Sequence, residues 1–132
     1  MIEMRSGFIT DITGLKEKSI TEAIKVKAGV SKKLDAKLFK VTLTFYQAKS
    51  RYKTIDQDIP RGDRGDLDNL IKLVIDGIGH IIGYRQSWEK INGKLVGSKS
   101  DNPLDSKIIE IVAKKINSGS EKEYVGIIIE GL

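Results

Sequence analysis

Two aspartates and a lysine stand at helical spacing in the middle of the chain. Residues 66–76 read Asp-Leu-Asp-Asn-Leu-Ile-Lys-Leu-Val-Ile-Asp. On a helix, Asp68, Lys72 and Asp76 follow one another at four-residue steps and share one side, while Asp66 stands just ahead of the first turn. Carboxylates bind Mg²⁺, and a lysine one turn later offers a compact positive charge to a phosphate. The spacing therefore fits a divalent metal beside a phosphate group.

The opposite side of the same segment carries an apolar stripe. Its members recur at three- and four-residue steps: Leu67, Leu70, Ile71, Val74, Ile75 and Ile78. This period is typical of an amphipathic helix packed on a core. We expect the helix to run to about Ile78, where Gly77, Gly79 and Gly83 weaken it.

Simpler interpretations exist for the same residues. Asp66 or Asp68 could cap the helix start, because a short acceptor side chain satisfies free N–H groups there. Asp68 and Lys72 could form an ordinary exposed pair contributing about 0.2–0.5 kcal/mol. The full pattern D-x-D-N-x-x-K-x-x-x-D, with a basic lead-in and a later acidic residue, favours the metal interpretation.

The composition excludes several classes of site. The 132 residues predict a single domain over 1–132, with 39% hydrophobic and 31% charged residues as in soluble globular proteins. The chain has no cysteine and one histidine, His80, so thiolate and multi-histidine sites are excluded. A metal site must use oxygen ligands, which points to Mg²⁺ or Mn²⁺. No apolar stretch approaches a membrane span and no signal peptide opens the chain, so we expect a cytoplasmic protein.

Positive charge gathers directly before the acidic motif. The net charge is +5, and five basic residues fall within sixteen positions. These candidate DNA-binding residues are Lys49, Arg51, Lys53, Arg61 and Arg64, with Tyr46 and Tyr52 in or next to the run. Basic residues beside a carboxylate pocket suit a phosphate backbone. A solvated basic surface loop is the alternative.

The segments before the motif suggest a strand, a helix and a strand. Residues 1–9 contain a possible short strand. The lysine-rich stretch 15–37 carries a weak helical pattern that ends at Gly29, a usual C-terminal stop. Residues 38–46 alternate apolar and polar side chains, which predicts a half-buried strand. Three breakers, Pro60, Gly62 and Gly65, then indicate a loop up to the motif.

The segments after the motif suggest a hairpin and two further elements. An Asn-Gly pair within 87–97 predicts a tight β-hairpin, because both residues accept positive φ. Trp88 lies on its first arm, and residues 97–103 are expected to be a linker. Residues 107–115 fit a strand or a helix equally well by pattern. Residues 123–130 alternate as a strand.

The motif resembles that of the RusA family of Holliday junction resolvases. The resemblance rests on Arg64-Gly65-Asp66-Leu67-Asp68-Asn69-Leu70-Ile71-Lys72, then Asp76, and on Leu104-Asp105-Ser106-Lys107-Ile108. It covers residues 38–116 with gaps. It implies an α+β fold, a small mixed β-sheet packed against one or two helices, and the β-hairpin near 87–97 looks like an insertion in that fold. It also makes 107–115 a strand.

The resemblance implies roles for individual residues. The metal ligands would be Asp66, Asp68 and Asp105, and the cation near the scissile phosphate would be Lys72. Asn69 and Asp76 would support the ligands without binding the metal. The family places its third carboxylate sooner after the helix, whereas residues 77–104 intervene here, and Asp101 is therefore a rival to Asp105. The family's proline-bearing N-terminal strand and loop are not recognisable.

The expected activity is Mg²⁺-dependent cleavage of four-way DNA junctions by a homodimer, with Mn²⁺ as a substitute metal. Clustered aspartates would hold one or two ions that polarise the phosphate and help to deprotonate a water. Lys72 would stabilise the developing charge, and the metal-bound water would attack phosphorus directly. The alternatives are a metal-dependent nuclease of other branched or flap DNA, and a catalytically inactive junction-binding protein.

Overall fold

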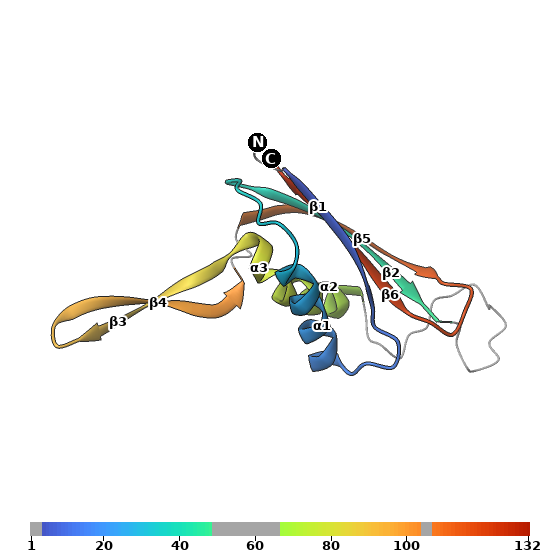
Figure 1. Ribbon diagram of the computed structural model, residues 1–132, viewed down its shortest axis with the longest axis horizontal. Coiled ribbons are helices and arrows are strands. Elements are labelled where there is room, and N and C mark those ends of the chain that lie inside the picture. Colours follow the sequence, from blue (N-terminus) through green and yellow to red (C-terminus); the bar gives the residue numbers. More distant parts are fainter. Residues whose placement is uncertain (1–3, 49–66, 104–106) are drawn as a thin grey trace.

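A four-stranded sheet with helices on one face makes up the body of the protein, and a long hairpin projects from it (Figure 1). The computed structural model describes residues 4–48, 67–103 and 107–132. In chain order the elements are β1 (Arg5–Asp11), α1 (Glu17–Gly29), β2 (Phe39–Gln47), α2 (Leu67–Gly77), α3 (Gly79–Ile82), β3 (Tyr84–Ile91), β4 (Lys94–Pro103), β5 (Ile108–Asn117) and β6 (Tyr124–Gly131).

The main sheet is mixed, with strand order β1-β6-β2-β5. β6 runs antiparallel to both β1 and β2, whereas β5 runs parallel to β2. The parallel pair confirms the mixed sheet, and the helices packed on this sheet confirm the α+β class. The strand expected at 1–9 is β1, which begins at Arg5 and extends to Asp11.

The core lies between the sheet and the helices. β2 alternates buried and half-buried residues along its whole length, so every second side chain faces the helices. The fully buried apolar members of β2 and β6 are Phe39, Val41, Leu43, Phe45, Val125, Ile127 and Ile129. Burying each such side chain stabilises the fold by about 1.5–3 kcal/mol. The expected half-buried strand at 38–46 is confirmed.

The two long helices run side by side in the same direction. The Thr21 hydroxyl of α1 donates to the Leu73 carbonyl of α2 at 3.1 Å, and later in both helices Ile24 lies against Gly77. Later residues of α1 thus contact later residues of α2, so the helices are parallel. The apolar stripe of α2 is buried at Leu70, Val74 and Ile75, which confirms the predicted amphipathic helix. Helix α1 ends at Gly29 as expected.

The hairpin of β3 and β4 turns at the Asn-Gly pair, with φ of 50° at Asn92 and 79° at Gly93. The hairpin is confirmed, but it is longer than the expected 87–97, and the expected linker at 97–103 is wrong. β4 continues through that segment, and Tyr84 pairs with Pro103. Pairing with β3 from Lys94 to Lys99 and again at Pro103 holds the segment as a strand, with an irregularity between, and outweighs a composition poor in strand formers.

The segment that fitted either a strand or a helix is strand β5. Its register with β2 runs from the pair Phe39–Ile108 to the pair Gln47–Asn117, with one irregularity next to Phe39. The strand expected at 123–130 is β6. In the described ranges, no helix combines the length and the apolar character needed to cross a membrane.

Candidate functional site

The first turns of α2 present the polar side predicted from the sequence. Asp68 and Lys72 are exposed, and Asp76 at the far end of the helix is half-buried. The Asn69 N–H donates to Asp68 Oδ1 at 3.0 Å. Within the described part of the chain, no ion pair of 4.0 Å or less joins Lys72 to either aspartate. Asp68 and Lys72 thus share a helix side without neutralising each other.

The start of α1 contributes a carboxylate that the sequence analysis did not single out. The side-chain amide of Asn69 donates to Glu17 Oε1 at 3.2 Å, across 52 residues of sequence. Glu17 is the first residue of α1, as Leu67 is of α2. The only sequence signal for Glu17 is an acid in a first helical turn. The contact between Glu17 and Asn69 could be found only by knowing that the two helices are parallel.

Because α1 and α2 are parallel, their N-terminal ends lie close together. The N-terminal end of each helix carries a partial positive charge and unpaired N–H groups. Because α1 and α2 start at the same end, both fields favour negative charge there. Glu17 and Asp68 are the first-turn acids of these helices. The place is therefore suited to carboxylates.

The remaining predicted site residues lie outside the described residues. They are the ligand candidates Asp66 and Asp105 and the basic residues Lys49, Arg51, Lys53, Arg61 and Arg64. Among the residues that the structure describes, no three or more His, Cys, Asp or Glu side chains form a group able to hold a metal ion. Since two of the three predicted ligands are not described, the metal site stays a prediction.

His80, the single histidine, lies in the last turn of α3 and is exposed. Its ring lies near Gly29 at the end of α1, whereas Asp68 lies in the first turn of α2. Nothing in this placement associates His80 with the carboxylates at the helix starts.

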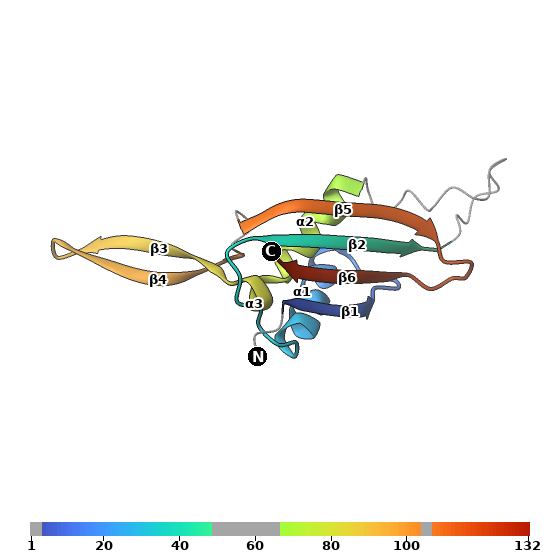
Figure 2. The ribbon, with the colours of Figure 1, turned by 90° about the horizontal axis from the view of Figure 1, so that it is seen from above.

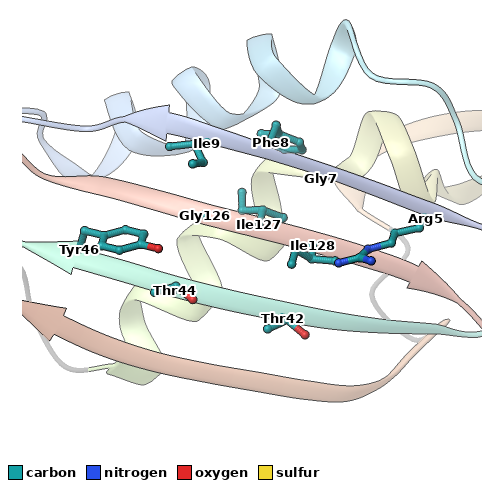
Figure 3. A pocket seen from close by; sticks show the side chains of 10 residues that line it. All are labelled: Arg5, Gly7, Phe8, Ile9, Thr42, Thr44, Tyr46, Gly126, Ile127 and Ile128. Carbon is teal, nitrogen blue, oxygen red and sulfur yellow. The ribbon is translucent and has the colours of Figure 1, made fainter. Parts of the chain in front are cut away.

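A shallow hollow of about 520 Å³ lies on the uncovered face of the sheet (Figure 3). It exists because Gly7 and Gly126 have no side chains, while Ile9, Tyr46 and Ile128 stand around them. The helices cover the opposite face, as Figure 1 shows. The hollow is therefore separate from the carboxylates at the start of α2.

Three buried polar side chains lie at the end of the sheet where β2 finishes. Gln47 is 0% exposed, Glu123 1% and Thr10 3%. The pair Tyr46–Tyr124 makes Gln47 and Glu123 neighbours on the helix side. Among the described residues, neither atom of the Gln47 amide nor the Thr10 hydroxyl has a hydrogen-bond partner. Unpaired buried polar groups cost stability, so the Gln47 amide and the Thr10 hydroxyl reduce the stability of the fold.

No family model, no curated protein and no solved structure matches this chain.

Proposed function

We propose that the protein is a Mg²⁺-dependent endodeoxyribonuclease that resolves four-way DNA junctions. The observation that carries the proposal is the start of α2, where Asp68 and Lys72 are exposed on one side of the helix and form no ion pair with each other. An acid and a base held apart in this way remain open to a cation and to a phosphate. The resemblance of residues 64–72 and 104–108 to the RusA motifs supports the choice of substrate.

The fold supports the proposal in a second way. A strand precedes the basic segment, the motif lies at the start of a helix, and a strand follows the second acidic segment. This order agrees with the order that the resemblance implies. Helices α1 and α2 are tied together through Asn69 and Glu17, so the motif rests on two elements of the scaffold.

The chemistry assigned to each group follows from its charge. Asp66, Asp68 and Asp105 would hold Mg²⁺, which polarises the phosphate and supplies an activated water. Lys72 lies one turn beyond Asp68 and would stabilise the negative charge that develops on the phosphate oxygens. Asn69 orients the carboxylate of Glu17, which adds negative charge to the same helix end.

The test is cleavage of a synthetic four-way junction in Mg²⁺, beside a linear duplex and a flap. The variants are Asp68→Asn and Lys72→Ala. Their matched controls are Asp35→Asn, an exposed loop aspartate, and Lys27→Ala, an exposed helical lysine. We expect paired nicks near the junction centre, lost in both site variants and kept in both controls.

Other outcomes choose among the alternatives. Metal-dependent cutting of the flap in preference to the junction would establish a nuclease of other branched DNA. Binding of the junction without cutting, in Mg²⁺ or Mn²⁺, would establish an inactive junction-binding protein. Equal cutting by Asp68→Asn and the unmodified chain would refute the site.

A further inference from the structure

Strand β5 forms an outer edge of the described sheet and exposes apolar side chains. The strand order places it beside β2 alone. The exposed fraction is 58% for Ile109, 43% for Ile111 and 46% for Val112. An outer strand offers backbone N–H and C=O groups to any chain that can pair with it. An exposed apolar outer strand is therefore a surface that favours pairing.

β5 carries one of the usual protections against such pairing, charged side chains, and lacks most of the others. Outer strands are commonly protected by charged side chains, especially lysine, by proline, by bulges or by being short. β5 has ten residues, contains neither proline nor glycine, and follows a regular register with β2 beyond its first residues. What it does contain is one acid and two lysines, and their spacing selects a partner.

The charges of β5 are complementary to those of a second copy of itself. A two-fold axis through Val112 sets two β5 strands antiparallel and pairs residues equally far from that position. Glu110 then lies opposite Lys114 of the partner, and Lys114 opposite the partner's Glu110. Both residues are exposed and share the uncovered face of the sheet with Val112, because they pair with Lys40, Thr42 and Thr44 of β2. Opposite charges directly across two strands stabilise the pairing.

Other registers lack this match. An axis through Glu110 or Lys114 sets like charges directly opposite each other, which is unfavourable. An axis through Ile111 or Ala113 sets Glu110 or Lys114 opposite Val112, so both charges lose their partners. Centring on Val112 also sets Ile111 opposite Ala113 of the partner. This register thus gives both Glu110 and Lys114 an oppositely charged partner and sets Ile111 opposite an apolar residue.

We propose that two copies of this chain pair through β5, antiparallel and centred on Val112, into one continuous eight-stranded sheet. A two-fold axis normal to the sheet keeps both helix layers on the same face. Figure 2 shows α2 beside β5 and α1 nearer to β1, so the two α2 helices lie on the inner side of the pair. The pairing would supply the homodimer interface that paired cutting of a junction requires, and this role rests on the proposed function. The pairing itself is argued from the residues of β5.

The test uses charge reversal. Sedimentation without DNA gives the association constant of the unmodified chain, of Glu110→Lys, of Lys114→Glu and of the double variant. Each single change puts like charges opposite in both symmetric pairs, so we expect association about tenfold weaker. The double variant restores opposite charges and should return to the original association. Thermal melts show that each variant is folded.

A cysteine test fixes the register independently of charge. The chain has no cysteine of its own. Under mild oxidation, Val112→Cys should give a disulfide-linked dimer, because opposite residues of paired strands have Cα atoms within disulfide reach. Ile109→Cys, on the same strand and with a side chain 58% exposed against 46% for Val112, lies opposite Lys115 and should stay unlinked.

Three results would overturn the pairing: a monomer at all concentrations, a dimer indifferent to the charge changes, or efficient linkage at Ile109 in place of Val112. These readouts do not require cleavage. A dimer that fails to cut DNA would refute the nuclease and leave the pairing intact, whereas a monomer that cuts would do the reverse.

Discussion

Replacing Gly77 by alanine tests the close parallel packing of α1 and α2. A Cβ at position 77 would lie 2.6 Å from Ile24 Cγ2, 2.7 Å from Ile24 Cβ and 3.1 Å from the Thr21 carbonyl oxygen. The nearest atoms belong to the root of a branched side chain and to helix backbone, so neither can swing away. The helices must move apart for Gly77→Ala to be accommodated.

Two effects of opposite sign set the magnitude. Overpacking in a well-packed core costs about 1–3 kcal/mol. Alanine in place of glycine within a helix returns up to about 1 kcal/mol, and less at the last residue, where Gly77 stands. We expect a net loss of about 1–2 kcal/mol in the free energy of unfolding. For a chain of this length the melting temperature should fall by roughly 3–10 °C.

The assay is thermal unfolding by circular dichroism together with urea unfolding. Gly29→Ala is the matched control, since Gly29 is also the last residue of a helix and its added Cβ would meet only the His80 ring, 3.9 Å away. The control should be neutral or slightly stabilised. If Gly77→Ala is as stable as the control, the close approach of the two helices does not exist and the argument from parallel helix starts loses its basis.

Three further results are expected. Gln47→Leu should raise the free energy of unfolding by about 1 kcal/mol in urea titrations, because it removes a buried amide that lacks partners among the described residues; a loss of stability would show that the amide is satisfied. Hydrogen bonds from the Thr13 hydroxyl (2.6 Å) and N–H (2.9 Å) lower the pKa of Asp11, so their stabilising contribution is present above the unfolded pKa and is lost as the pH falls through the lower folded pKa. In Thr13→Ala the pKa of Asp11 measured by NMR should rise, and an unchanged value would contradict the assignment. Mg²⁺ should raise the melting temperature of the unmodified chain and not that of Asp68→Asn; equal melting points with and without Mg²⁺ would count against the carboxylate pocket.

The helix of the motif could be predicted because its two faces are chemically distinct. The stripe that includes Leu70 and Val74 matched the helical period, and both residues are buried. β2 was predictable for the corresponding reason, since its alternation has a period of two. In each case the signal lies within one element and needs no knowledge of its neighbours.

Where the outcome depends on a distant neighbour, the sequence pattern was not sufficient. Residues 107–115 fitted two periods, and pairing with β2, more than sixty positions earlier, makes them a strand. Residues 97–103 have a composition that favours a linker, yet pairing with β3 makes them part of β4. Glu17 was missed because its contact with Asn69 follows from how α1 and α2 pack.

Because α1 and α2 start at the same end, two opposing electrostatic effects act on the carboxylates there. Clustered acids without a cation repel one another, so removal of one should stabilise a metal-free protein. Here Glu17 and Asp68 each lie in the first turn of a helix, where the helix dipole favours an acid by about 0.3–1 kcal/mol. The two effects oppose each other. A metal-free Asp68→Asn variant that melts higher than the unmodified chain would therefore show that repulsion exceeds the dipole contribution, which requires further carboxylates close to Asp68. A lower melting temperature would show that the dipole contribution exceeds the repulsion, and that Asp68 acts as a stabilising acid at the start of α2.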